Sequence, residues 1–387
     1  MTDTPARPCI HLVAGARPNF MKIAPMVRAL RADGRLAWKI VHTGQHYDRN
    51  MSDVFFEELG IPAPDVHFNC GGGSHASQTA RIMEAFEAHI GNDRPSLVMV
   101  VGDVNSTLVC GIVAKKSGIP VAHLEAGLRS GDMTMPEEIN RIVTDSISDW
   151  FFVTEPSGVA HLQHEGHAAD RIHHVGHVMV DNVMHQAAQL DAMAPEAAAA
   201  LDTHAIKQRL RGTGGQGRYG VVTLHRPANV DDPAVLAGIA GALKDIAAEL
   251  PLVFPVHPRT RANLERIAAE RGGESALGAK VHLMDPQPYM SFLNLWKDAA
   301  VVLTDSGGLQ EETTALGVPC VTLRDNTERP VTVDEGSNVL AGTDPERIRA
   351  LGLQVVRGEL KKAGKRPALW DGKAAERVVD VLAKALH

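Results

Sequence analysis

The sequence has little cysteine, no excess of basic charge and no long apolar run, and each absence excludes a class of protein. Its 387 residues include four cysteines, at positions 9, 70, 110 and 320, which are widely scattered and form no C-x-x-C pair. Such usage cannot build a dense disulfide framework, so we expect a protein of the reducing cytoplasm.

Charge and hydropathy narrow the setting further. The formal net charge of −7 at pH 7 argues against a nucleic-acid binder with a diffuse basic surface, so an anionic ligand must be held locally. No apolar run approaches the ~20 residues that span a bilayer, and the polar segment 1–8 does not resemble a signal peptide. With 44% hydrophobic and 22% charged residues, the chain is expected to be globular, and its length suits two domains.

Short apolar runs alternate with helical stretches along the whole chain. Their continuous hydrophobicity predicts strands buried on both faces, as in parallel sheets. We therefore expect an α/β protein of two Rossmann-like doubly wound domains that face one another, spanning 1–180 and 218–369, with a helical and Gly-rich linker at 181–217. The predicted strands are 10–14, 38–42, 97–101, 121–124, 150–153, 221–224, 252–256, 281–284, 301–303 and 319–323.

The most informative stretch begins with the apolar run 299–303. That run breaks at Ser306, Gly307 and Gly308 and leads into a helix-like segment. Two glycines without Cβ atoms let a phosphate approach the free N–H groups of a helix N-terminus. Glu312 would lie on the first turns of that helix, where its carboxylate could accept hydrogen bonds from a ribose. The pattern indicates a nucleotide site, although an ordinary strand-to-helix turn has the same signature.

A second glycine-rich stretch does not indicate a nucleotide site. Residues 212–217 spell G-x-G-x-x-G, but a helical segment precedes them and a strand follows. The dinucleotide fingerprint needs the opposite order, with a strand before the glycines and a helix after them. We interpret this stretch as a loop at the domain join, and no nicotinamide site is implied.

Acidic residues follow two predicted strands of the first domain. Asp103 ends one strand and Glu125 ends another, and polar groups at these positions usually face a ligand. The next predicted helix carries Glu137 and Arg141, which are four residues apart and so share one helix face. For this second pair, a solvated surface ion pair is the simpler interpretation.

Other charged residues also lie at predicted strand ends. The positions are Arg17 and Lys22 after the first strand, His225 and His257 in the second domain, and Arg329 after a later strand. Six further histidines, between positions 161 and 177, lack an H-E-x-x-H helix or a cysteine partner. We interpret those six as surface and structural residues, and we expect no metal site.

Many separate motifs in register resemble the non-hydrolysing UDP-N-acetylglucosamine 2-epimerase family. They include G-A-R-P-N-F-M-K, T-G-Q-H, V-G-D-V-N-S-T, H-L-E-A-G-L-R-S, M-P-E-E-I-N-R, V-T-L-H-R, P-V-H-P, T-D-S-G-G-L-Q-E-E and R-D-N-T-E-R-P. The resemblance runs from residue 10 to about 342. It implies a glycosyltransferase-B-like fold with the active site in the cleft, and a C-terminal helix within 370–387 that returns to the first domain.

The resemblance assigns expected roles residue by residue. Positions that match catalytic residues of the family are Asp103, Glu125, Glu137, Arg141 and His225. Positions that match substrate-binding residues are Arg17, Lys22, His257, Gln287, Phe292, Ser306, Gly307, Gly308, Glu312 and Arg329. Positions in regions that can form a second, allosteric site are Gln45, His46 and Arg226, although the sequence departs from the family around them.

The chemistry implied by the resemblance is elimination of UDP to a 2-acetamidoglucal, followed by readdition of UDP, with no cofactor or metal. Packing Asp103, Glu125 and Glu137 together is expected to raise the pKa of at least one of them by like-charge repulsion. Which carboxylate is the base stays open. The expected partner is a UDP-sugar, in a homodimer that binds neither nucleic acid nor membrane.

Several alternatives stay open at the level of sequence. A hydrolysing epimerase would share the fold and the residues but release UDP and N-acetylmannosamine. A 2-epimerase of a UDP-diacetamido-uronic acid would need one more cationic contact, such as Arg129 or Arg141. A glycosyltransferase is less consistent with clustered carboxylates, and a nucleotide-sugar sensor would bind UDP without turnover.

Overall fold

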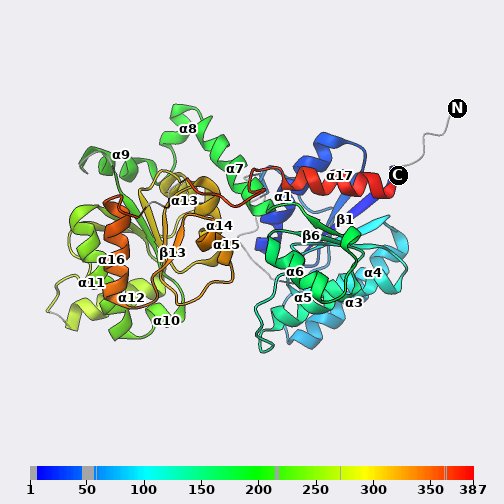
Figure 1. The fold of residues 1–387 in the computed structure, drawn as a ribbon, viewed down its shortest axis with the longest axis horizontal. Helices are drawn as coiled ribbons and strands as arrows, with labels where there is room; N and C mark the ends of the chain where they lie inside the picture. The colour runs from blue at the N-terminus through cyan, green and yellow to red at the C-terminus, as the bar shows by residue number, and fades with distance from the viewer. Residues whose placement is uncertain are drawn as a thin grey trace. The chain divides into compact units, whose positions relative to one another are not determined.

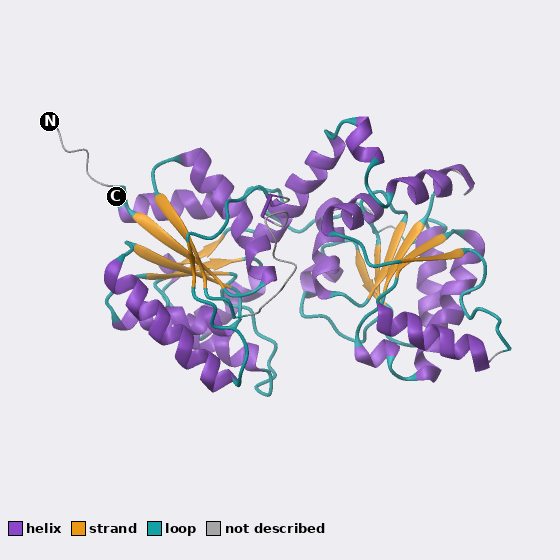
Figure 2. Cartoon of the chain, turned by 180° about the vertical axis from the view of Figure 1, so that it is seen from behind, coloured by secondary structure: helices purple, strands orange, loops and turns teal. Residues whose placement is uncertain are grey.

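The computed structural model describes residues 7–45, 56–57, 59–213, 218–270, 272–360, 362 and 364–387. The chain divides into two compact units, which Figures 1 and 2 show as strands enclosed by helices. Unit 1 comprises Met1–Asn182 with Ala368–His387, and unit 2 comprises Val183–Pro367. Within the described residues, no helix is long and apolar enough to cross a membrane.

Unit 1 contains a seven-stranded sheet in the order β3-β2-β1-β4-β5-β6-β7, with parallel pairing throughout. The strands are β1 (Cys9–Ala14), β2 (Ala37–His42), β3 (Val66–His67), β4 (Leu97–Val101), β5 (Val121–Leu124), β6 (Trp150–Val153) and β7 (Ile172–His174). The helices are α1 (Arg17–Asp33), α3 (His75–Asn92), α4 (Asn105–Lys116), α5 (Pro136–Ile147), α6 (Pro156–His164), the 3-10 turn η1 (Ala169–Arg171) and α17 (Ala374–Leu386). Helix α7 (Val178–Asp191) crosses the boundary between the units.

Unit 2 contains a six-stranded parallel sheet in the order β10-β9-β8-β11-β12-β13. The strands are β8 (Gly220–Thr223), β9 (Leu252–Pro255), β10 (Val281–Met284), β11 (Val301–Thr304), β12 (Cys320–Thr322) and β13 (Asn338–Leu340). The helices are α8 (Pro195–Ala199), α9 (His204–Thr213), α10 (Pro227–Val230), α11 (Pro233–Glu249), α12 (Pro258–Glu270), α13 (Tyr289–Trp296), α14 (Gly307–Leu316), α15 (Pro330–Asp334) and α16 (Pro345–Val356).

The predicted fold class of two doubly wound Rossmann-like units is confirmed, and the apolar runs explain it. Every residue of β4 is buried, as expected for a central strand covered on both faces. Three strands were not predicted: β3, β7 and β13 contain two or three residues each and lie at sheet edges. Such short, half-buried strands carry no continuous apolar run, so hydrophobicity alone does not reveal them.

Each sheet has one point at which the strand order reverses. In unit 1 this switch point lies between β1 and β4, and in unit 2 it lies between β8 and β11. Helices leave the two neighbouring strands toward opposite faces there, which opens a crevice at the carboxyl ends where ligands of such sheets bind. The segments that follow these four strands are therefore the first places to search for a site.

The C-terminal helix α17 packs against α1 within unit 1 (Figure 1). The buried carboxylate of Asp181 accepts hydrogen bonds from the backbone N–H groups of Ala374 (3.1 Å) and Ala375 (2.7 Å) at the start of α17. Because a carboxylate at a helix N-terminus satisfies N–H groups that lack partners, this contact fixes the start of α17 to unit 1.

Candidate active site

The switch point of unit 1 is held together by Asn19, which is 2% exposed. Its Oδ1 accepts hydrogen bonds from the backbone N–H groups of Gly15 and Ala16, both at 3.0 Å. Its Nδ2 donates to the carbonyl oxygen of Val101 at 3.1 Å. The start of α1 is thereby tied to the end of β4, which brings the loops after β1 and β4 to one place.

Glu125 and Lys22 form an ion pair at this sheet edge. Glu125 is 3% exposed and has a φ of 74°, a left-handed backbone conformation that is costly for a residue with a side chain. Gly102 allows this approach, because a Cβ there would lie 3.2 Å from Lys22 Nζ. A buried, strained glutamate beside an ammonium group is a typical feature of a functional site.

Asp103, Arg141 and Glu138 form a second charged group beside the first. Arg141 Nη1 lies 2.5 Å from Asp103 Oδ2, and its Nη2 lies 2.7 Å from Glu138 Oε2. Burial opposes the ionisation of Glu138, but hydrogen bonds from the backbone of Ser130, from Arg141 and from the backbone of Gly131 lower its pKa to about 2. Glu138 therefore stays charged and holds the guanidinium in place.

Glu137 lies in the first turn of α5, as the sequence predicts. Its side chain is exposed, and Arg141 pairs with Glu138, three residues away, rather than with Glu137, four residues away. Of the other two carboxylates expected beside it, Asp103 faces Arg141 and Glu125 faces Lys22.

The switch point of unit 2 is built around Asp305, a fully buried residue directly after β11. Its carboxylate accepts hydrogen bonds from the backbone N–H groups of His225 (3.1 and 3.2 Å) and Arg226 (2.9 Å), and from Asn229 Nδ2 (3.1 Å). His225 Nδ1 lies 2.9 Å from Asp305 Oδ1, while half of the His225 side chain stays exposed. Burial works against ionisation of Asp305, but the bonds from His225, Arg226 and Asn229 hold its pKa below the usual value.

The predicted strand–turn–helix around Ser306 is confirmed. Ser306 is the N-cap of α14, and its Oγ accepts a hydrogen bond from Leu309 N at 3.5 Å. A Cβ on Gly308 would meet no atom within 4 Å, and one on Gly307 would meet only Glu328 Oε2, at 3.9 Å. The space beside the two glycines at the start of α14 is therefore open, which lets an anion approach this helix N-terminus.

Two neighbouring glutamates on α14 have different partners. Glu311 forms an ion pair with Arg329, whereas Glu312 accepts a hydrogen bond from the hydroxyl of Tyr289 at 3.2 Å. Burial raises the pKa of Glu312 to about 8, and the Tyr289 hydrogen bond only partly offsets this effect. Glu312 is thus protonated at neutral pH in the absence of a ligand.

The remaining predicted residues lie in the segments that follow the strands of the two sheets. In unit 2, Gln287 Nε2 donates to the carbonyl oxygen of Asp285 at 2.8 Å, and Phe292 lies half-buried on α13. His257 is exposed directly before α12, where its Nδ1 accepts a hydrogen bond from Arg259 N at 3.3 Å. In unit 1, Arg17 is half-buried at the first position of α1.

Two of the three predicted allosteric positions, Gln45 and Arg226, lie within the described residues. Gln45 is buried, and its Oε1 accepts hydrogen bonds from Ser106 N (2.9 Å) and Ser106 Oγ (2.7 Å), so it links its loop to α4. Arg226 Nε donates to the carbonyl oxygen of Asp305 at 3.1 Å. His46 lies outside the described residues.

The sequence analysis missed several residues that organise these edges: Asn19, Glu138, Tyr289 and Asp305. Each lies within a few residues of a predicted site residue, and Asp305 directly precedes the predicted Ser-Gly-Gly turn. An acid directly after a buried strand was the signal that identified Asp103, and the same signal could have identified Asp305.

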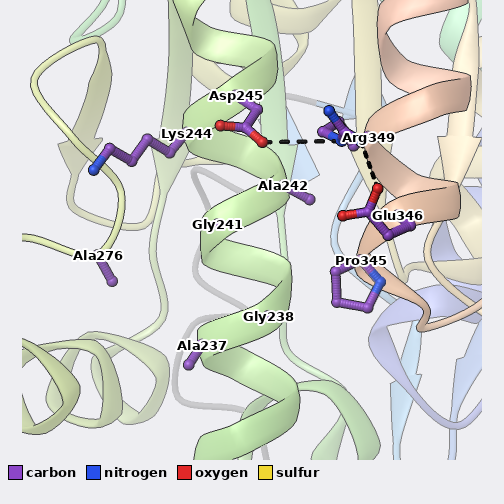
Figure 3. Close-up of a pocket in the computed structure, with 10 residues that line it drawn as sticks. All are labelled: Ala237, Gly238, Gly241, Ala242, Lys244, Asp245, Ala276, Pro345, Glu346 and Arg349. Atoms are coloured by element: carbon purple, nitrogen blue, oxygen red, sulfur yellow. Dashed lines mark hydrogen bonds and ion pairs between the residues drawn. The ribbon is translucent and has the colours of Figure 1, made fainter.

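A cavity of about 360 Å³ in unit 2 lies away from these edges, along α11 and the start of α16 (Figure 3). Small residues such as Gly238 and Gly241 line one wall. Arg349 on α16 pairs with Glu346 at 2.5 Å and lies 3.9 Å from Asp245 on α11. None of the predicted site residues lines this cavity.

One group among the described residues has the composition of a metal site: His11, His89 and Asp93 of unit 1, with ligand atoms within 4.8 Å of one another. Lys39 Nζ already lies 2.6 Å from Asp93 Oδ2. The same oxygen faces His11 Nε2 at 3.6 Å, so one of the three potential ligand atoms is already paired with an ammonium group. The six histidines between 161 and 177 do not belong to this group.

Comparison with known proteins decides the family. The family model described as UDP-N-acetylglucosamine 2-epimerase matches residues 28–383. The chain belongs to the UDP-N-acetylglucosamine 2-epimerase family. It is 38% identical to the UDP-N-acetylglucosamine 2-epimerase of Methanocaldococcus jannaschii over 96% of this chain and 98% of that protein.

Two further comparisons bear on the substrate class. The chain is 39% identical to the UDP-2,3-diacetamido-2,3-dideoxy-D-glucuronate 2-epimerase of Pseudomonas aeruginosa, over 97% of this chain and 99% of that protein. A crystal structure of the Methanocaldococcus jannaschii enzyme in complex with UDP-GlcNAc and UDP is similar at a TM-score of 0.76 and 36% identity, and covers 97% and 99% of the two chains.

Proposed function

We propose that this enzyme is a non-hydrolysing 2-epimerase that interconverts UDP-N-acetylglucosamine and UDP-N-acetylmannosamine. The observation that carries the proposal is the contrast between the two switch points. Unit 1 presents the buried Lys22–Glu125 pair beside Asp103 and Arg141, whereas unit 2 presents an open helix N-terminus next to Glu312. The first set suits proton transfer at a sugar, and the second suits a nucleoside diphosphate.

We assign the UDP moiety to unit 2. The first turn of α14 offers free N–H groups to the diphosphate, and the guanidinium of Arg329 adds positive charge. Glu312 accepts hydrogen bonds from the ribose, while Gln287 and Phe292 frame the uracil. His225 is oriented by Asp305 and faces the departing diphosphate, where it stabilises the negative charge that develops.

We assign the sugar to unit 1. A carboxylate, either Asp103 or Glu125, removes the proton from carbon 2 while the bond between carbon 1 and the UDP oxygen breaks, which leaves a 2-acetamidoglucal. A second acid then delivers a proton to the opposite face of carbon 2, and the UDP oxygen adds back to carbon 1. The exposed side chain of Glu137 makes it a weaker candidate for either step than its sequence position suggests.

A second candidate substrate is a UDP-diacetamido-uronic acid, which the similarity to the Pseudomonas aeruginosa enzyme supports. Its additional carboxylate needs an additional cation. Arg129 lies 2.7 Å from the buried Asp145 and 2.6 Å from Glu165, so its guanidinium already balances two carboxylates. Arg141 likewise faces Asp103 and Glu138. This pairing favours the uncharged N-acetylglucosamine sugar.

The test is to incubate the protein with UDP-N-acetylglucosamine and to identify the products by NMR. The proposal predicts an equilibrium mixture of the two UDP-sugars and no free sugar. Release of UDP with N-acetylmannosamine would identify a hydrolysing enzyme instead. UDP binding without turnover would identify a sensor, and turnover of the diacetamido-uronate alone would transfer the proposal to that substrate. We also propose a homodimer, which sedimentation of the same sample would test.

A further inference from the structure

His123 lies two residues before Glu125, on β5, and neither the sequence analysis nor the proposed chemistry gives it a role. Its side chain is fully buried, and both ring nitrogens have partners. Nε2 lies 2.8 Å from the carbonyl oxygen of Gly102, and Nδ1 lies 2.6 Å from Asp145 Oδ1. The imidazole is thus enclosed between two oxygen atoms that can accept hydrogen bonds.

The two partners fix the protonation of the ring. A carbonyl oxygen only accepts hydrogen bonds, so Nε2 must carry a hydrogen to donate to Gly102. The other oxygen of Asp145 receives Arg129 Nη1 at 2.7 Å and Gly127 N at 3.1 Å. Burial works against ionisation of Asp145, but the charges and hydrogen bonds of His123 and Arg129 hold its pKa below the usual value.

A charged Asp145 can only accept a hydrogen bond from His123 Nδ1. Both ring nitrogens therefore face hydrogen-bond acceptors, and the imidazolium form is the one that offers a donor to each. Its charge is balanced by Asp145, whose second oxygen is held by Arg129, itself paired with Glu165 at 2.6 Å. Charges buried this deeply are costly unless each is paired and hydrogen-bonded, as these are.

The hydrogen bond from His123 ends at the turn that carries Asp103. Gly102 has a φ of 66°, and its N–H donates to the carbonyl oxygen of Leu124 at 3.0 Å. The carbonyl group of Gly102 belongs to the peptide bond that leads into Asp103. On the far side, Asn140 Nδ2 donates to the carbonyl oxygen of Asp103 at 2.8 Å. The peptide groups before and after Asp103 are thus both held by side chains.

We propose that His123 is a positioning residue, held as an imidazolium by Asp145 and Arg129, that fixes the Gly102–Asp103 turn and so places the Asp103 carboxylate for proton transfer. This inference rests on the proposed function, because it assumes that Asp103 acts at the sugar. A misplacement of about 1 Å in a reacting group lowers turnover by about 10²-fold, so fixing this turn has a measurable effect on rate.

The charge of His123 is tested first, in the unmodified protein and without substrate. Nitrogen-15 NMR of the histidine side chains should show one ring, assigned by its absence in His123→Gln, that carries hydrogens on both nitrogens from pH 6 to 8. In Asp145→Asn the same ring should carry one hydrogen only. A neutral ring at His123 in the unmodified protein would overturn the proposal, whatever the protein catalyses.

The positioning role is tested by turnover and UDP affinity together. In His123→Gln, kcat should fall about 10²-fold, while KM and the UDP dissociation constant should change by less than about threefold. Asp145→Asn keeps the hydrogen bond to Gly102 and removes the charge, so its kcat should fall about tenfold, between the unmodified protein and His123→Gln.

His161 provides a matched control, because its Nδ1 lies 2.9 Å from the carbonyl oxygen of another glycine, Gly127, within the same unit. His161→Gln should keep kcat within about twofold, as a change away from the reacting groups does. If His123→Gln does not fold, Asp145→Asn decides, because it identifies the ring by the loss of one of its two hydrogens and its kcat tests the role. An unchanged kcat in Asp145→Asn or His123→Gln would overturn the positioning role of His123. If the unmodified protein showed no turnover, the proposed function itself would be wrong.

Discussion

Two buried glutamates, one in each unit, show two ways in which a protein holds a carboxyl group near a ligand. Glu125 of unit 1 is 3% exposed and faces the ammonium group of Lys22. Glu312 of unit 2 is 9% exposed, accepts a hydrogen bond from the hydroxyl of Tyr289 and lies near the carboxylate of Glu311. Both side chains are buried, but only Glu125 faces a cation in the contacts described above.

The difference determines what each carboxyl group can do. A paired carboxylate is charged before the substrate arrives, and it can accept a proton from a sugar at once. A buried carboxyl group without a cation keeps its proton, and the pKa of Glu312 is raised to about 8 by burial. Glu312 becomes charged only when a ligand supplies hydrogen-bond donors. We therefore expect chemistry to depend on Glu125, and proton-linked binding to depend on Glu312.

The largest expected effect is on turnover when Glu125 loses its charge. Glu125→Gln should lower kcat by about 10²- to 10⁴-fold, as loss of an acid or base usually does, while UDP affinity stays within about threefold. Steady-state kinetics and calorimetry measure the two quantities. Glu155→Gln is the control, because Glu155 is also a buried glutamate of unit 1 and accepts a hydrogen bond from Ser157 at 2.7 Å. A Glu125→Gln protein with normal kcat would contradict the assignment.

The next effect is on nucleotide affinity. Glu312→Ala or Arg329→Ala should weaken UDP binding by about 10- to 100-fold, since hydrogen bonds to charged groups contribute about 1.5–3 kcal/mol. Asp103→Asn should keep UDP affinity while turnover is lost. Glu249→Gln provides a surface control in unit 2, where Glu249 pairs with Arg357. If Asp103→Asn lost UDP binding as severely as Arg329→Ala, the assignment of UDP binding to unit 2 and of the chemistry to unit 1 would be wrong.

A smaller effect is the release of a proton on binding. Below pH 8, free Glu312 carries a proton because its pKa is raised to about 8, and hydrogen bonds from the ribose favour the carboxylate. Binding should therefore release a proton, and affinity should rise with pH up to about 8 and then level off.

Asp103→Asn with UDP-N-acetylglucosamine allows this measurement, because turnover is blocked and the bridging diphosphate does not titrate near neutral pH. Calorimetry in two buffers with different ionisation enthalpies counts the protons released. The additional variant Glu312→Gln should abolish the release. Proton uptake, or release that persists without Glu312, would show that the glutamate binds the ribose in its protonated form.

The smallest effect is expected for Tyr289→Phe. The Tyr289 hydroxyl donates to Glu312 and partly offsets the rise in its pKa. Without this hydrogen bond the pKa of Glu312 should rise further, so the pH at which UDP-N-acetylglucosamine affinity levels off should move upward. Affinity at pH 7 should fall by a few-fold, in line with one neutral hydrogen bond of about 1 kcal/mol. A shift of the pH profile downward would contradict this role of Tyr289.

Much of the site could be predicted from the sequence, because parallel sheets place strand ends at a common edge. Asp103, Glu125 and His225 follow apolar runs that form central strands, so their position at the carboxyl edges follows from the fold. The Ser306 turn was predicted because glycines directly after a buried run mark a helix start.

Other features depend on packing that a linear pattern does not contain. Neighbouring residues on a helix point about 100° apart, and only the packing of α5 decides that Glu138 rather than Glu137 faces Arg141. The pair of His225 and Asp305 joins residues 80 positions apart, at two strands that become neighbours only in the folded sheet. His123 on β5 and Asp145 on α5 also meet only in the folded unit, 22 positions apart in the sequence.

The measurement that tests the proposed chemistry most directly is turnover in deuterated water. If a carboxylate of unit 1 removes the hydrogen from carbon 2, the UDP-N-acetylmannosamine formed from UDP-N-acetylglucosamine must carry deuterium at that carbon. Mass spectrometry and NMR of the product would show one deuterium atom per epimerised molecule. Epimerised product without deuterium at carbon 2 would contradict elimination and readdition, and would require a route in which that hydrogen never exchanges with water.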